Sequence, residues 1–275
     1  MGKKVTKNST SPAGSKWTGM VPVGDTVLAV TDTGGPGVPV VYLNGHAGIQ
    51  PQWRRVIADL GTEWRHITYD MRARGRSKRS ADYSFETNVR DVDAVLAARG
   101  VERALLVGWS YGAFVAAHWV SRNPGRTVGA ILVEGAQPYD WLDEAIEQRI
   151  RKLWRRLSWL MFLLRPFGVA PRMTAEQLAN SNIEAGEIAR ERELGPVLDN
   201  ITVPTRYVLA SGASLGSKGD EQELIRASLP AVTARNSNIK ISAKVSSNHG
   251  NILRKDFRAV AAAVREVAAL DRDRH

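Results

Sequence analysis

The sequence predicts an α/β fold in which a mostly parallel central sheet is flanked by helices. Short apolar runs typical of buried strands recur along the chain, and helical patterns separate them. Strands that alternate with helices in this way form parallel sheets with right-handed crossover connections. The 275 residues, of which 43% are hydrophobic and 24% charged, suffice for one large domain of this kind.

The expected elements follow the chain in a regular order. Two strands at 20–23 and 26–31 are joined by Gly24-Asp25, which is a strong hairpin signal. Further strands are predicted at 38–43, 65–69, 104–107, 128–133, 202–210 and 239–245. Helices are predicted at 50–60, 84–98, 113–120, 220–229 and 251–270. Ser84 is the expected N-cap of the second of these helices.

One segment departs from the alternation of strands and helices. Residues 137–199 show helical patterns without a strand, which indicates a helical lid (cap) inserted into the α/β core. The core is then formed by residues 20–136 and 200–275. Residues 1–19 are polar and basic, and we expect them to form a disordered tail.

The first lid helix is expected to be amphipathic. A run of basic residues between 149 and 156 flanks the apolar face, which favours either a membrane surface or a partner protein as ligand. Within a lid, the simpler interpretation is that the apolar face packs on the core and lines the substrate entrance. The residues of this face are Ile146, Ile150, Leu153, Trp154, Leu157, Leu160, Met161 and Leu164.

Composition limits the classes of partner. The net charge is +10, but the basic residues are scattered and no nucleic-acid-binding motif organises them, so we expect no nucleic-acid partner. No apolar run is long enough for stable membrane insertion, and the first residues lack the hydrophobic core of a secretory signal. The absence of cysteine excludes disulfides and thiolate chemistry. A cytoplasmic location is therefore the expectation, and a homodimer is left open.

The candidate nucleophile lies in Gly108-Trp109-Ser110-Tyr111-Gly112. A buried strand is predicted before this segment and an Ala-rich helix after it, which is the context of a G-x-S-x-G nucleophile elbow. Ser110 must take a strained backbone conformation in so tight a turn, and glycines two residues away remove Cβ atoms that would collide. The serine hydroxyl would then stand above the carboxyl edge of the sheet.

A serine needs a base to take its proton, and the chain has five histidines. We expect His249 to be the base, because it falls between the last strand and the last helix, where a loop can deliver imidazole to the elbow. The others are less well placed by their positions in the predicted elements, although His46 could line the pocket. They are His46, His66, His118 and the terminal His275.

An oxyanion hole requires two N–H groups aimed at the developing charge. One is expected from the backbone of Tyr111, directly after the nucleophile. The other is expected from His46, in the loop after the strand at 38–43, where Gly45 allows close approach of the backbone. A plain glycine turn at this loop is the alternative.

The chain resembles the α/β-hydrolase superfamily from about residue 20 to residue 270. The Gly108–Gly112 elbow, the His249 loop and the Asp70–Ser77 stretch occur in the order found in that family. The Asp70–Ser77 stretch is similar to the family's D-x-R-G-x-G-x-S segment. Asn44 stands where the family usually has a histidine in its H-G oxyanion loop, which changes what supports that loop.

The acid departs further from the family pattern. Family members commonly carry an aspartate after the strand at 202–210, where this chain has Ser211-Gly212-Ala213-Ser214. Relatives such as zearalenone-lactonase-like hydrolases instead carry a glutamate after the strand that follows the elbow helix. Glu134 occupies that place and is the expected acid, with Asp220 as the alternative. A structural salt bridge from Glu134 to a lid arginine is a further alternative.

The resemblance implies a serine hydrolase that cleaves an ester or lactone through an acyl-enzyme, with no metal or organic cofactor. We expect a small-molecule substrate with a bulky apolar or aromatic group, bound by aromatic residues and by Gly45. A cofactor-free dioxygenase, a carbon–carbon bond hydrolase and a non-catalytic ligand-binding homologue are the alternatives on the same fold. The aromatic residues are Trp109, Trp141, Trp154 and Trp159.

Overall fold

The computed structural model describes residues 15–165, 170–212 and 219–272, without the side chains of residues 219–222. The strands are β1 (Trp17–Val23), β2 (Thr26–Asp32), β3 (Pro39–Leu43), β4 (Arg65–Tyr69), β5 (Ala104–Trp109), β6 (Thr127–Val133), β7 (Thr205–Gly212) and β8 (Ile239–Asn248). They form one sheet in the order β1-β2-β4-β3-β5-β6-β7-β8. Strand β2 is antiparallel to both of its neighbours, β1 and β4. The other six strands, β4, β3, β5, β6, β7 and β8 in sheet order, are mutually parallel. The α/β fold class is thereby confirmed.

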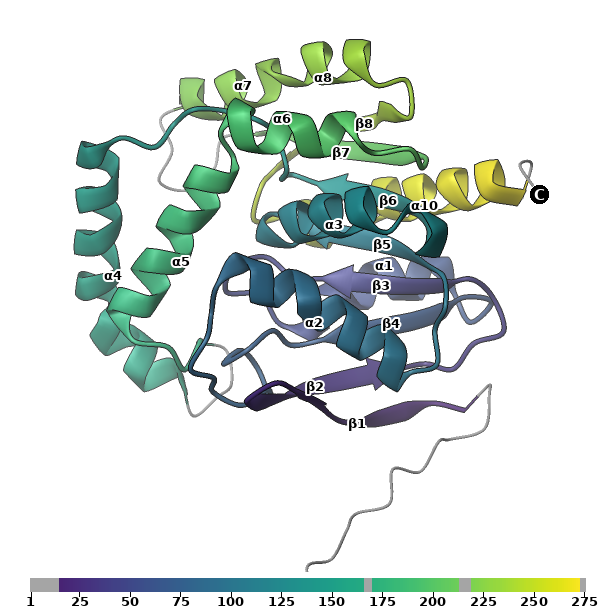
Figure 1. Ribbon diagram of the computed structural model, residues 1–275, viewed down its shortest axis with the longest axis horizontal. Helices are drawn as coiled ribbons and strands as arrows, with labels where there is room; N and C mark the ends of the chain where they lie inside the picture. Colours follow the sequence, from purple (N-terminus) through teal and green to yellow (C-terminus); the bar gives the residue numbers. More distant parts are fainter. Residues whose placement is uncertain (1–14, 166–169, 213–218, 273–275) are drawn as a thin grey trace, which may run out of the picture.

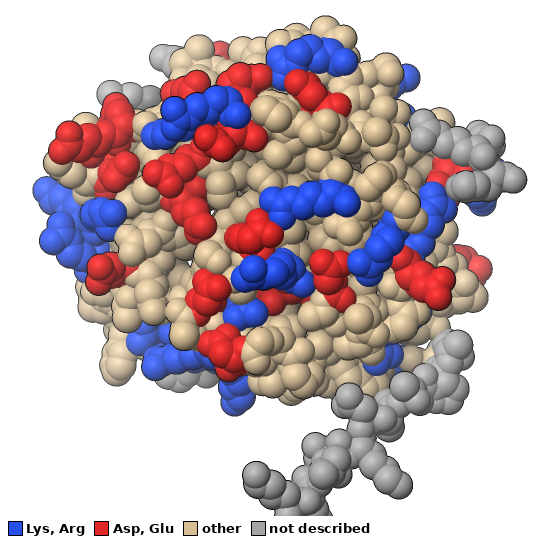
Figure 2. Space-filling model, viewed as in Figure 1, with Lys and Arg blue, Asp and Glu red and all other residues tan. Residues whose placement is uncertain are grey.

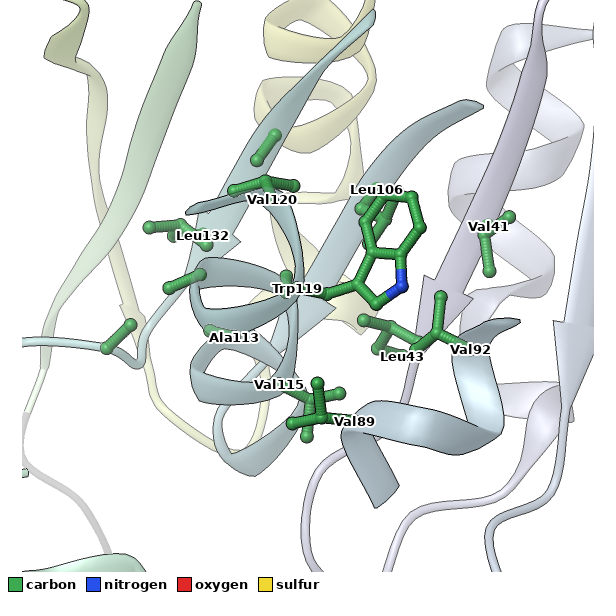
Figure 3. Close-up of a cluster of buried hydrophobic side chains, with 14 of the residues drawn as sticks. Val41, Leu43, Val89, Val92, Leu106, Ala113, Val115, Trp119, Val120 and Leu132 are labelled. Carbon is green, nitrogen blue, oxygen red and sulfur yellow. The ribbon is translucent and has the colours of Figure 1, made fainter. Parts of the chain in front are cut away.

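Helices cover both faces of the sheet (Figure 1). The buried cluster on one face contains residues of α2 (Phe85–Ala98) and α3 (Tyr111–Arg122), and the cluster on the other contains residues of α1 (Arg54–Leu60) and α10 (Phe257–Arg272). On the first face, Trp119 lies between α3 and the sheet among Leu43, Leu106 and Val92 (Figure 3). Its indole is fully buried, as expected of a large core side chain.

Local signals in the sequence explain several element boundaries. Ser84 accepts a hydrogen bond from the Thr87 amide and so caps α2, as predicted. Gly24 has a φ of 54° in the turn between β1 and β2, a conformation that favours glycine. A short 3₁₀ helix, η1 (Gln50–Trp53), begins the helix predicted at 50–60.

Several element boundaries differ from the prediction. Strand β1 begins at Trp17, inside the predicted tail, because its pairing with β2 extends to Asp32 and the Arg99 guanidinium lies 4.1 Å from the Trp17 ring. The rest of that tail, residues 1–14, lies outside the described residues. The predicted helices at 220–229 and 251–270 are each divided, the first into α7 (Gly219–Ala227) and α8 (Leu229–Arg235), the second into α9 (Ile252–Lys255) and α10.

Residues 137–199 contain α4 (Glu144–Leu164), α5 (Ala175–Ile188) and α6 (Glu191–Asp199). Helices α4 and α5 stand at the end of the molecule toward which β3 points (Figure 1). This is the carboxyl edge of the parallel strands, where ligands bind in open α/β sheets. Among the described residues, no helix is both long and apolar enough to cross a bilayer.

The glycines of the elbow allow close backbone packing. A Cβ atom on Gly112 would lie 2.1 Å from the Leu43 carbonyl oxygen, which is backbone and cannot rotate away. We expect Gly112→Ala to lower the free energy of unfolding by about 1–3 kcal/mol in urea denaturation followed by circular dichroism. Gly125→Ala is the matched control because its Cβ would meet nothing within 4 Å. Equal stability of the two variants would contradict this account.

Candidate active site

Ser110 lies at the turn between β5 and α3 in a strained conformation. Its φ of 55° and ψ of −120° fall where residues other than glycine are rarely found, and its amide donates to the Val133 carbonyl at 2.9 Å. The Ser110 residue thus precedes the first turn of α3, whose N–H groups have no acceptor within the helix. This is the geometry of a nucleophile elbow, with the hydroxyl at the carboxyl edge of the sheet.

His249 reaches Ser110 from the far end of the chain. Its Nε2 lies 3.0 Å from the Ser110 Oγ, and its backbone carbonyl accepts a hydrogen bond from the Trp109 indole at 3.2 Å. The Trp109 ring also lies against the imidazole, with 5.6 Å between ring centroids. Trp109, predicted to bind substrate, therefore holds the loop that carries His249.

Glu134 follows β6 and faces the other nitrogen of the same imidazole. Its Oε2 lies 3.6 Å from His249 Nδ1, and its side chain is 2% exposed. The backbone of Glu134 has a φ of 47°, so two of the three residues brought together here are strained. The structure thus brings Ser110, His249 and Glu134 into one line of contacts.

Arg226 of α7 also binds the Glu134 carboxylate, which the sequence did not predict. Its Nη2 lies 3.1 Å from Oε2, and the amide of Ala210 donates to Oε1 at 2.7 Å. Burial by itself would raise the pKa of Glu134, but hydrogen bonds from His249, Arg226 and Ala210 outweigh it and lower that pKa. The carboxylate is therefore ionised at neutral pH. The alternative of a salt bridge to a lid arginine is wrong in its partner, since Arg226 lies outside residues 137–199.

The other histidines are engaged elsewhere. His46 Nε2 lies 3.1 Å from the Ser181 Oγ, and burial together with the Arg74 charge lowers the pKa of His46 to about 3. His66 bonds the Tyr42 hydroxyl, and His118 packs against Phe85 with 4.8 Å between ring centroids. Among the described histidines, His249 alone contacts Ser110. His275 lies outside the described residues.

The loop after β3 stands beside the elbow, as the oxyanion-hole prediction requires. A Cβ on Gly45 would lie 3.4 Å from the Ser110 Cβ, and His46 and Tyr111 both line the cavity above Ser110. Buried Arg74 donates to the His46 carbonyl at 2.9 Å and holds this loop. The role of the His46 and Tyr111 amides in binding an oxyanion stays a prediction.

The Asn44 side chain supports the loop after β3, at the position where the family usually has a histidine. Its side-chain amide donates to the Tyr69 carbonyl at 2.7 Å, and its carbonyl accepts from the Trp53 indole at 2.8 Å. Asn44 is buried, so both ends of the side chain need these partners. The loop is thereby tied to β4 and to η1.

A cavity of about 320 Å³ opens above Ser110. Trp141 lines it as predicted, whereas Trp154 does not line it and packs against His46, with 5.8 Å between the ring centroids. The expectation that Trp159 binds substrate is not met, because Trp159 is 65% exposed on the outer side of α4. Other apolar residues that line the cavity are Phe114, Ala185, Ala189 and Ile225.

Asp220, the alternative acid, lies in α7, and its side chain is outside the described residues. Within the described parts of the chain, no three histidine, aspartate or glutamate side chains gather in a way that could hold a metal ion.

A family model described as "alpha/beta hydrolase fold" matches residues 38–161, which include the elbow and Glu134. This segment, less than half of the chain, is similar to the α/β-hydrolase family. Its sequence is 30% identical over 139 residues to a haloalkane dehalogenase of Mesorhizobium japonicum, which covers 50% of this chain and 45% of the relative. The chain thus spans less than half the length of the curated relative that it matches.

Solved structures match nearly the whole chain. A thermophilic esterase from Thermogutta terrifontis superposes with a TM-score of 0.70 and 19% identity, covering 93% of this chain and 99% of the esterase. An enol-lactonase from Burkholderia xenovorans superposes with a TM-score of 0.68 and 20% identity, covering 91% and 100%. Similarity at this level of identity establishes the fold.

The Arg226 clamp should affect the response of this protein to acid. The lowered pKa of folded Glu134 means that its ionised form stabilises the fold above the unfolded-state pKa, about 4.3, and that this contribution is lost as the pH falls through the folded-state pKa. Arg226→Gln removes one cause of the lowered pKa of Glu134. We expect its acid-unfolding midpoint, measured by circular dichroism, to move to higher pH.

Arg235→Gln is the matched control for this titration. Arg235 also binds two carboxylates, those of Asp199 and Glu191, but the three side chains are 39%, 45% and 49% exposed. Water screens such pairs, so the control should shift the midpoint less. A larger shift of the acid-unfolding midpoint in Arg235→Gln than in Arg226→Gln would contradict the role of Arg226 in lowering the pKa of Glu134.

Proposed function

We propose that this protein is a serine hydrolase that cleaves a carboxylic ester or lactone through an acyl-enzyme. The observation that carries the proposal is the 3.0 Å contact between Ser110 Oγ and His249 Nε2 at a strained elbow. Relatives named as dehalogenases share the fold, but that chemistry uses a carboxylate at the elbow, where this chain has a serine. The serine therefore favours acyl transfer.

The proposed reaction proceeds in two balanced halves. His249 Nε2 takes the Ser110 proton as Oγ attacks the substrate carbonyl, and it then gives that proton to the leaving alkoxide. Water, deprotonated by the same nitrogen, next attacks the acyl-enzyme, and Ser110 recovers its proton as the carboxylic acid leaves. Glu134 holds the imidazole in one tautomer and stabilises the imidazolium. The amides of Tyr111 and His46 stabilise the tetrahedral oxyanion.

The cavity suggests the class of substrate. Its volume of about 320 Å³ suits a small molecule, and aromatic and aliphatic side chains line it on the side of α3, α5 and α7. Trp141 and Phe114 offer flat apolar surfaces to an acyl or alcohol group. We therefore propose a bulky apolar or aromatic ester or lactone.

Labelling with a fluorophosphonate tests the proposal, with the modified peptide located by mass spectrometry. We expect a phosphonyl adduct on Ser110, because only an activated serine displaces fluoride at a useful rate. Absence of an adduct would contradict the acyl-enzyme. Oxygen consumption by such unlabelled protein, with an aromatic heterocycle and no added cofactor, would then identify a cofactor-free dioxygenase, whereas inertness in both assays would indicate a non-catalytic homologue.

A further inference from the structure

Helix α4 has two apolar sides, of which one is covered. None of its side chains is fully buried. Half-buried residues recur at helical spacing on the side that contacts α5, namely Ile146, Ile150, Trp154, Leu157, Met161 and Leu164. This corrects the expectation that the whole apolar face packs inward, because Leu153 and Leu160, assigned to that face, are 52% and 37% exposed.

The outer side of α4 ends in a cluster of exposed apolar residues. Trp159, Phe162 and Leu163 are 65%, 67% and 54% exposed, and they follow one another within two turns. Large apolar side chains so concentrated on one exposed segment are unusual on a monomeric protein and mark an interaction surface. We call residues 159–163 the apolar segment of α4.

A cationic segment precedes the apolar segment on the same helix. It consists of Arg149, Arg151, Lys152, Arg155 and Arg156, and no acidic residue occurs from 148 to 164. Among the described residues, no carboxylate pairs with Arg149, Lys152, Arg155 or Arg156. Figure 2 shows Lys and Arg gathered at the edge of the molecule where α4 lies, whereas the rest of that face mixes both signs.

The two segments are separated along the helix axis. Their centres lie about 13 Å apart at the helical rise of about 1.5 Å per residue. A helix whose apolar end enters a bilayer by about 5–10 Å leaves side chains at that separation among the headgroups. Trp159 is the first residue of the apolar segment, on the side of the cationic segment, at the level where tryptophan favours the membrane–water boundary.

We propose that α4 docks the protein on an anionic membrane surface. The apolar segment enters the outermost acyl chains, and the cationic segment binds lipid phosphates. A second copy of this chain fits the surface less well, because a two-fold contact through α4 would bring the two cationic segments together. The inner side of α4 places Trp154 against His46, so docking brings the membrane beside the cavity and gives apolar lipid-dissolved molecules a short path to it.

Co-sedimentation of the full chain with lipid vesicles tests the proposal. We expect binding to mixed phosphatidylcholine–phosphatidylglycerol vesicles that weakens with added salt, and little binding to phosphatidylcholine alone. Arg155→Gln/Arg156→Gln should lower the partition coefficient by about tenfold or more. Arg192→Gln/Arg258→Gln has the same net charge, removes side chains that are 70% and 81% exposed elsewhere, and should retain binding.

The apolar segment is tested separately. Trp159→Ser/Phe162→Ser should also lose binding, whereas Leu224→Ser, which removes an apolar side chain 53% exposed on α7, should not. Circular dichroism verifies that each variant is folded. Equal losses in the two arginine pairs, equal binding to both vesicle types, or no binding by the wild type would each overturn the proposal. None of these readouts depends on hydrolase activity.

Discussion

Ser110→Ala is expected to lower kcat for hydrolysis of an activated aryl ester by about 10⁵–10⁶-fold. Alanine leaves no oxygen to attack the carbonyl, so the acyl-enzyme cannot form, and only binding and oxyanion stabilisation remain. The change removes a hydroxyl that is hydrogen-bonded to His249. We therefore expect the thermal unfolding curve to change little, which separates the loss of chemistry from the loss of fold.

His249→Ala supplies the second arm of this experiment. A serine without its base and a base without its serine should be nearly equally inactive, because the two act as one unit. The double variant should consequently be no slower than either single variant. Ester turnover that survives in Ser110→Ala, or losses that multiply in the double variant, would contradict the proposed proton transfer from Ser110 to His249.

Glu134→Gln is expected to lower kcat by about 10⁴-fold. The neutral amide cannot stabilise the imidazolium that forms when His249 takes the serine proton, and it can present an N–H instead of an acceptor to Nδ1. The carboxylate is 2% exposed, so water does not replace it. Steady-state kinetics of the purified variant with the same aryl ester measures the effect.

Two matched variants test whether the loss of kcat in Glu134→Gln reports the acid of the site. Arg226→Gln breaks the same ion pair but leaves a carboxylate 3.6 Å from His249, so it should retain far more activity than Glu134→Gln. Asp220→Asn tests the alternative acid and should change kcat by no more than a few-fold. A large loss of kcat in Asp220→Asn with a small loss in Glu134→Gln would show that Asp220 of α7 is the acid instead.

Local sequence was sufficient for the elements that bury continuous apolar runs. Strand β6 (Thr127–Val133) lies within one residue of its predicted range, 128–133, because burial on both faces requires an apolar run whatever the neighbouring strands are. The strand order was not predictable in the same way. The placement of β4 between β2 and β3 depends on pairings between distant segments, which periodicity does not report.

The residues of the site also differ in whether local sequence could predict them. Ser110 and Glu134 each follow a buried strand, and neighbouring parallel strands bring their carboxyl ends together, so the residues could be proposed from position. Arg226 lies 92 residues after Glu134 and in a different layer, and no local pattern distinguishes it from the other arginines of a basic chain. The same holds for α4, whose amphipathic pattern indicated an apolar face but not which side α5 covers.

The sequence by itself determined the α/β class, the elbow around Ser110 and the strand ends that carry the candidate acid. These depend on short-range sterics and on the periodicity of apolar residues. Only the tertiary structure decided that Arg226 clamps Glu134, that Trp154 packs against His46, and that Trp159 faces away from the cavity. Each of these depends on how segments distant in sequence pack, and on the burial and charge that result.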